Sequence, residues 1–115
     1  MSDYDLMSEL QKKTAMLEVS VKQLRQNGTA YAEAERAYKI LLRTEVLKLR
    51  DEGQAVGVIE KIAYGIPSVA EARFKRDVAQ VVYTANQEAI QSIKLQLRLL
   101  ENQIGREWTT GGKTL

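Results

Sequence analysis

The side chains in this sequence that could bind a charged ligand are basic residues spaced at helical intervals. Arg36, Lys39, Arg43 and Arg50 follow one another at three, four and seven residues, so a helix would carry them on one stripe. The planar guanidinium group of arginine can bond two phosphate oxygens at once. A tyrosine ring beside it could stack on a base or offer a hydroxyl. The pattern therefore predicts a binding site for an anion or a nucleotide.

Two arginines from a later stretch, Arg73 and Arg76, could complete this site from a neighbouring helix. The candidate ligand-binding residues are then Arg36, Tyr38, Lys39, Arg43, Arg73 and Arg76, with Tyr31, Phe74 and Tyr83 as further rings for stacking. The alternative is structural, with the basic residues paired to carboxylates and the tyrosines in the core. The carboxylates available for such pairs are Glu33, Glu35, Glu45, Glu71 and Asp77. Glu35 precedes Lys39 by four residues, which is the spacing of a helical ion pair.

Catalytic chemistry is limited by two residue types that the sequence lacks. There is no cysteine and no histidine, so disulfides, thiolate nucleophiles, Cys/His zinc sites and imidazole bases are all excluded. The acidic residues show no catalytic pairing, since Glu33 and Glu35 fall on different faces of a helix. We therefore predict that the chain is not an enzyme and holds no metal or cofactor.

The composition is typical of one small globular domain. The chain has 115 residues, of which 44% are hydrophobic and 28% are charged. Its net charge of +2 is small for a general nucleic-acid binder. No apolar run approaches the ~20 residues that span a bilayer. The first residues, MSDYDLMSEL, lack the apolar segment of a secretion signal. We expect a cytoplasmic protein with no membrane partner.

One long helix is expected over residues 4–51, although an Asn-Gly pair lies within it. One apolar row recurs every seven residues, through Leu10, Leu17, Leu24, Tyr31 and Tyr38. A second row of the same period runs through Met7, Thr14, Val21, Gly28, Glu35, Leu42 and Leu49. A turn at Gly28 would shift this phase, so the unbroken period favours one helix, weakened there by about 1 kcal/mol. The alternative is a turn at Asn27-Gly28 with Thr29 as the cap of a new helix.

Glycine and proline divide the rest of the chain. Gly53 suits the position just after a helix, Gly65 the end of a second helix, and Pro67 the first turn of a third. These residues predict a short helix over 55–64, a long helix over 67–108 and a disordered tail over 109–115. The long helix carries apolar residues at intervals of three and four, namely Val78, Val82, Ala85, Ala89, Ile93, Leu97, Leu100, Ile104 and Trp108.

The predicted fold class is all-α, with two long antiparallel helices and a short connecting helix. The seven-residue rows are typical of a coiled-coil-like helical bundle, here a single helical domain over residues 1–108. Several apolar residues cover more than one face of the first helix, namely Ile40, Leu41, Leu42, Val46, Leu47 and Leu49. A helix that is apolar on several sides is buried on several sides. We therefore expect the chain to form a homo-oligomer, and among the possible oligomers we expect a dimer.

Residues 60–77, with the sequence EKIAYGIPSVAEARFKRD, offer an alternative function. A helix, a tight turn and a basic helix resemble a helix-turn-helix, in which Arg73, Lys75 and Arg76 would meet DNA. The second helix is too long for that motif, and no third helix remains to complete its core. The pattern therefore favours a simple helical corner over a DNA-reading element.

Three stretches of the chain resemble a group of small helical proteins encoded in phages and prophages of Gram-positive bacteria. They are YAEAERAYKILLRTEVLKLRDEGQAVGVIEKIAYG, VAEARFKRDVA and IKLQLRLLENQIGREW, which together lie within residues 29–108. This resemblance brings no assigned activity and no functional residues. It implies a viral accessory protein that acts in the cytoplasm of a bacterial host.

The leading functional hypothesis is a non-enzymatic, phage-encoded binding protein that counters host defence. Its partner would be a nucleotide-like small molecule that it sequesters, or a host defence protein that it covers. One alternative is a nucleic-acid-binding accessory protein of phage recombination or replication, whose binding would weaken steeply with salt. Another is a purely structural helical oligomer.

Overall fold

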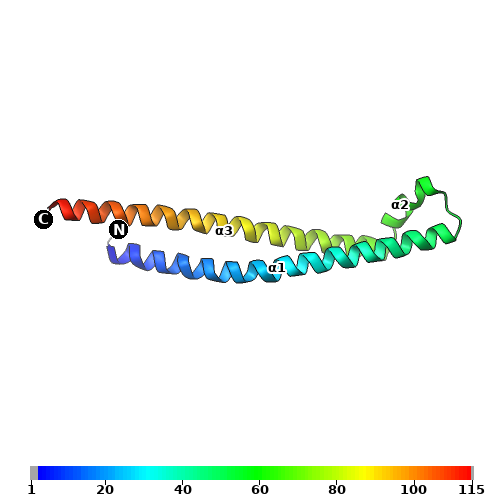
Figure 1. Ribbon diagram of the computed structural model, residues 1–115, viewed down its shortest axis with the longest axis horizontal. Helices are drawn as coiled ribbons and strands as arrows, with labels where there is room; N and C mark the ends of the chain where they lie inside the picture. Colours follow the sequence, from blue (N-terminus) through cyan, green and yellow to red (C-terminus); the bar gives the residue numbers. More distant parts are fainter. Residues whose placement is uncertain (1–2, 115) are drawn as a thin grey trace. The chain divides into compact units, whose positions relative to one another are not determined.

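A computed structural model describes the backbone of residues 3–114 and the side chains of residues 4–109. It contains three helices, α1 (Asp3–Asp51), α2 (Val56–Tyr64) and α3 (Pro67–Thr114), shown in Figure 1. Within the described residues there is no strand. The predicted all-α fold, with two long helices that pack on each other and a short helix between them in the chain, is confirmed.

Helix α1 continues through Asn27-Gly28, as its seven-residue period predicts. The glycine has a packing role, because the ring of Tyr83 lies against the α1 backbone at this point. A Cβ atom added at Gly28 would be 3.1 Å from Cε1 of Tyr83. The same ring lies beside Tyr31, with centroids 6.0 Å apart. Because Gly28 has no side chain, the Tyr83 ring of α3 can pack directly against the α1 backbone.

The corner between α1 and α2 depends on Gly53, the only residue with positive φ among those described, at 85°. The amide of Gln54 donates to the carbonyl of Leu49 at 3.1 Å and closes the end of α1. Ala55 has extended backbone angles and precedes the first residue of α2. Gly65 ends α2, and Pro67 begins α3, both as predicted.

The inner face of each long helix follows a regular alternation of three and four residues. On α1 the buried or half-buried positions include Leu6, Leu10, Lys13, Leu17, Ser20, Leu24, Asn27, Tyr31, Ala34, Tyr38, Leu41 and Glu45. On α3 they include Val69, Ala72, Arg76, Ala79, Tyr83, Asn86, Ile90, Ile93, Leu97, Leu100 and Ile104. This spacing is the heptad of a coiled coil, and it fits the predicted coiled-coil-like packing.

The inner row of α3 differs from the predicted one in its first half. Val78 and Val82, expected in the core, are each 46% exposed, and Trp108 is also exposed. The inner positions are held instead by Arg76, whose side chain is 21% exposed, and the buried Asn86. The Arg76 guanidinium lies over the Tyr38 ring of α1, and the Asn86 amide donates to the Ser20 carbonyl of α1, so apolarity alone did not identify the inner face.

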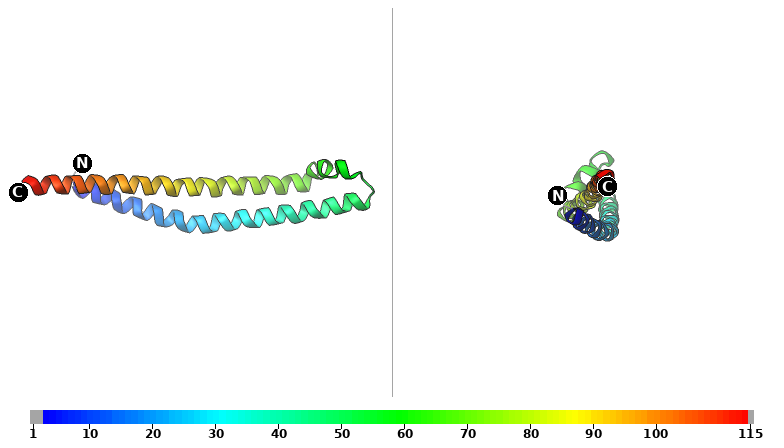
Figure 2. Two further views of the ribbon diagram at one scale, coloured as in Figure 1. Left: turned by 45° about the horizontal axis from the view of Figure 1, so that its top comes forward. Right: turned by 90° about the vertical axis from the view of Figure 1, so that its left-hand side faces the viewer.

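The chain, expected from its length to form a single domain, divides into two compact units. Unit 2 covers residues Gln26–Thr84. In it α1 and α3 lie side by side and run antiparallel, with α2 at their joined ends, as Figure 2 shows from two further directions. A core cluster of Leu49, Ile59 and Ala63 fixes α2, and Leu42, Val46 and Ile66 pack against that cluster.

Unit 1 contains the first part of α1, up to Arg25, and the part of α3 that begins at Ala85. Its buried apolar side chains include Leu6, Ile90 and Ile93. The side-chain amide of Asn86 donates a hydrogen bond of 3.0 Å to the backbone carbonyl of Ser20. This bond joins α3 to α1 across 66 residues of sequence.

The end of α3 lies beyond its predicted boundary at residue 108. The helix runs to Thr114, so residues 109–114 are helical where a disordered tail was expected, and Leu115 lies outside the described residues. The hydroxyl of Thr109 donates to the carbonyl of Gly105 at 2.9 Å, one turn back. Glycine disfavours a helix by only about 1 kcal/mol per residue, so Gly111 and Gly112 weaken the helix without ending it.

Candidate functional site

Two of the predicted ligand-binding residues meet at the centre of unit 2. The guanidinium of Arg76 lies over the ring of Tyr38, at 4.7 Å from its centroid, and Tyr38 is only 6% exposed. The carboxylate of Asp77 accepts a hydrogen bond of 2.8 Å from Nε of Arg76. An aromatic face and a carboxylate thus both engage this guanidinium, which serves the packing of α3 on α1.

Arg73 and Lys39 also have partners within unit 2. Arg73 lies over the ring of Tyr64, 5.3 Å from its centroid, and so links α3 to α2. Lys39 pairs with Glu35 at 3.5 Å on the surface of α1. Such exposed helical pairs contribute only a few tenths of a kcal/mol, so Lys39 remains available to a competing anion.

The other two predicted residues, Arg36 and Arg43, lie on the opposite face of α1 from Tyr38. Helical geometry requires this, because they are two residues before and five residues after that buried ring. Both are exposed, and no ion pair involves either one within the described part of the chain. Arg50, a further seven residues along, is exposed on the same stripe.

The structure therefore does not gather the six candidate residues into one pocket within a chain. Arg76 contacts Tyr38, Arg73 contacts Tyr64, and Arg36 and Arg43 point away from both pairs. Of the carboxylates in the structural alternative, Asp77 and Glu35 form the pairs just described. Among the aromatic residues, Tyr38 is buried, Tyr31 and Tyr83 are half-buried, and Phe74 is exposed.

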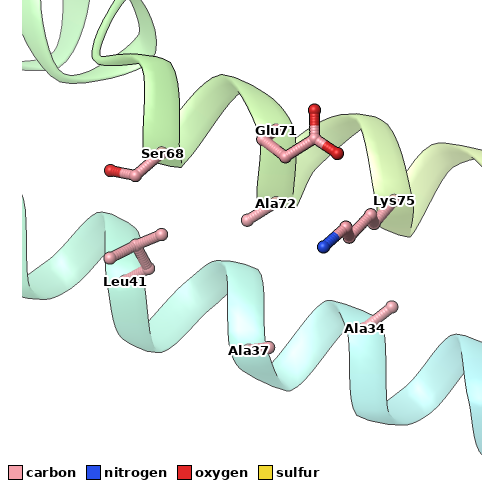
Figure 3. A pocket seen from close by; sticks show the side chains of 7 residues that line it. All are labelled: Ala34, Ala37, Leu41, Ser68, Glu71, Ala72 and Lys75. Carbon is pink, nitrogen blue, oxygen red and sulfur yellow. The ribbon is translucent and has the colours of Figure 1, made fainter.

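A groove that the sequence did not reveal lies between α1 and α3 in unit 2 (Figure 3). Its volume is about 370 Å³, and its lining residues are Ala34, Ala37, Leu41, Ser68, Glu71, Ala72 and Lys75. Most of these side chains are small, so they leave an open channel between the two helix backbones. A helical wheel of either helix would show part of this lining, but only the antiparallel register brings the two parts together.

The corner that resembles a helix-turn-helix uses its basic residues for internal contacts. α2 has nine residues and α3 has 48, so the second helix does not have the short length of a recognition helix. Arg73 and Arg76 lie over tyrosine rings of the protein itself. Lys75, the third basic residue of the motif, lines the groove.

The described residues form neither a cluster of metal-binding side chains nor a helix suited to cross a membrane. No group of three or more acidic, histidine or cysteine side chains is placed to hold a metal ion in the part of the chain with described side chains. Neither long helix carries, among its described residues, an apolar stretch of the length that a membrane crossing needs.

Comparisons with known proteins identify no relative of this chain. No family model matches the chain, and neither a curated protein nor a solved structure is significantly similar to it.

Proposed function

We propose that this chain is a non-enzymatic helical binding protein that self-associates and acts by covering the surface of a partner protein. The observation that carries the proposal is the exposed apolar row of α3. Phe74, Val78, Val81 and Val82 are between 46% and 67% exposed, whereas the inner row of the same segment contains Arg76 and Tyr83. A helix whose outer row is more apolar than its inner row needs a second partner.

The balance of exposed and buried side chains supports the same proposal. Among the described side chains, more large apolar residues are exposed than buried.

The setting proposed for this function is the cytoplasm of a bacterial host, where the protein would inhibit a defence protein. That setting comes from the resemblance to phage-encoded helical proteins. The structure favours covering a protein over enclosing a nucleotide, because Tyr38, Arg73 and Arg76 are already engaged inside unit 2. Exposed arginines next to Ile40 and Leu47 suit a protein surface that carries apolar and acidic residues.

Native mass spectrometry and sedimentation velocity of the tag-free protein would test this proposal. We expect a dimer or a larger homo-oligomer over a wide concentration range, with a mass that is a multiple of the chain alone. A protein that stays monomeric at the highest concentrations would contradict the proposal. A retained mass of nucleotide size would contradict the preference for a protein partner.

A second candidate function, binding of a phosphate-bearing ligand, is favoured by one observation. Arg36 and Arg43 are exposed, lie seven residues apart on one stripe and form no ion pair among the described residues. Titration calorimetry with nucleoside triphosphates, on the wild type and on Arg36→Ala and Arg43→Ala, would test this function. Unchanged affinity in both variants would exclude the stripe. Arg76→Ala is a poorer test, because it also removes the contact with Tyr38.

A further inference from the structure

We propose that a second copy of this chain docks on the groove of unit 2, across a two-fold axis, to form a four-helix interface. The proposal deepens the self-association proposed above and depends on it. It names the surface that self-association uses and the charged residues that the two copies exchange.

The groove is bordered by exposed apolar side chains of α3. On α3, Val78 and Val82 follow Lys75 by three and seven residues and so continue its stripe. Val78 and Val82 are each 46% exposed. The groove and its borders thus form one apolar face, which a packed helix would remove from water.

The opposite side of the same helix pair does not offer such a face. It carries the ion pair of Lys39 with Glu35, and α2 covers part of it through the contact of Arg73 with Tyr64. The core of α2 also packs there against Leu42 and Val46 of α1. Another helix pair would therefore find a continuous apolar face on the groove side and not on this one.

Charge identifies a second copy as the occupant. Glu71 and Lys75 lie one turn apart on the α3 side of the groove, and neither forms an ion pair with any described residue. In Figure 3 the Lys75 ammonium reaches toward the space between the helices, while the Glu71 carboxylate turns away from it. A two-fold axis through the groove would place each Lys75 near the partner subunit's Glu71. Such self-complementarity is what an isologous interface requires.

The first experiment is thiol crosslinking, which is specific here because the chain contains no cysteine of its own. Ala37→Cys introduces a single thiol at the groove, and Gln80→Cys places a single thiol on an exposed position of α3 away from it. A short bis-maleimide crosslinker should convert the Ala37→Cys protein to a covalent dimer in much higher yield than the Gln80→Cys protein. Equal yields from the two variants would overturn the proposal.

The second experiment reverses the charges at the rim. Glu71→Lys and Lys75→Glu should each weaken the dimer by roughly tenfold, because each change creates two repulsive contacts per interface. The double variant should restore the wild-type dissociation constant, measured by sedimentation equilibrium. Circular dichroism should show unchanged helix content in all three variants, since both positions are exposed. Loss of the dimer in the double variant would contradict the proposed pairing of Lys75 with Glu71 of the partner subunit.

The result for Ala37→Glu separates this inference from the function on which it rests. We expect this variant to be a folded monomer, because a charge in the groove would be buried by the second copy. If the wild type is a dimer and Ala37→Glu is also a dimer, the groove interface is overturned and the proposed self-association stands. A wild-type protein that is always monomeric would overturn both proposals and leave the groove to a different protein.

Discussion

The ring of Tyr83 lies against the backbone of α1 at Gly28, where a Cβ atom would be only 3.1 Å from its Cε1. Few real Cβ contacts are this short, so a side chain at residue 28 would displace the ring. The glycine that weakens α1 locally is therefore the residue that lets α3 approach closely. Helix propensity and helix packing make opposite demands at this one position.

The first prediction concerns Gly28→Ala. In the wild-type background the change should be nearly neutral, because a gain of about 1 kcal/mol in helix propensity is offset by the displaced ring. In a Tyr83→Ala background the same change should stabilise the protein by about 1 kcal/mol. Urea unfolding followed by circular dichroism would measure both differences in unfolding free energy.

Gly105→Ala is the matched control, since nothing lies within 4 Å of the Cβ position at this helical glycine. It should stabilise the protein by about 1 kcal/mol in either background. If Gly28→Ala were equally stabilising with and without the Tyr83 ring, the ring would not restrict that position.

The second prediction concerns the contact of Arg76 with Tyr38. Arg76→Met keeps the length of the side chain and removes its charge, so it should cost about 0.5–1 kcal/mol of unfolding free energy. Arg36→Met, on the exposed outer face of α1, should change it by less than about 0.5 kcal/mol. In a Tyr38→Leu background the cost of Arg76→Met should disappear. A cost that is independent of Tyr38 would mean that the contact contributes nothing.

The third prediction concerns Asn86, a buried polar residue on the inner row of α3 in unit 1. Asn86→Ala should destabilise the protein by about 1–2 kcal/mol, because the bond to the Ser20 carbonyl is lost and a cavity remains. Asn86→Leu should recover that stability. The two helices should then no longer pack in one unique register, since a polar residue in a coiled-coil seam specifies their alignment. Native mass spectrometry would then show more than one oligomeric species. Gln87→Ala, at the exposed neighbouring position, should leave both properties unchanged.

The fourth prediction concerns α2, whose only buried residues are Ile59 and Ala63. Ile59→Ala should remove about 2–3 kcal/mol of packing free energy from α2. Hydrogen exchange should show the loss as faster exchange in α2, while the amides of α1 and α3 keep their protection. Val58→Ala, at a position that is 42% exposed, should have little effect. Uniform loss of protection across all three helices would show instead that α2 is essential to the whole fold.

Sequence periodicity predicted the helices well because each boundary has a local cause. The phase of the seven-residue rows across Gly28 correctly indicated one helix, and Gly53 and Pro67 mark the predicted corner. The end of α3 differs from its predicted position, because the helix continues through Gly111 and Gly112 to Thr114. The cost of each glycine is small beside the hydrogen bonds of a helix already formed.

The surfaces of the molecule were predicted less well, because they depend on which face of each helix is turned inward. Arg76 and Asn86 occupy inner positions of α3 that apolar residues were expected to hold. Their side chains are satisfied by Tyr38 and by the Ser20 carbonyl, which are 38 and 66 residues away in sequence. The groove has the same origin, since its two walls come from separate stretches of the chain. Such pairings follow from register, and one sequence does not encode register in any local pattern.

The antiparallel course of the two long helices also determines the order in which their contacts can form. Leu49 and Ile59, in the core beside the corner, are ten residues apart, whereas Ser20 and Asn86 are separated by 66. Closing the longer loop from the unfolded chain costs about 1.7 kcal/mol more entropy. The chain should therefore fold as a zipper, nucleating at the corner and closing toward its ends. Folding rates should then fall with Ile59→Ala, while Asn86→Ala should mainly accelerate unfolding.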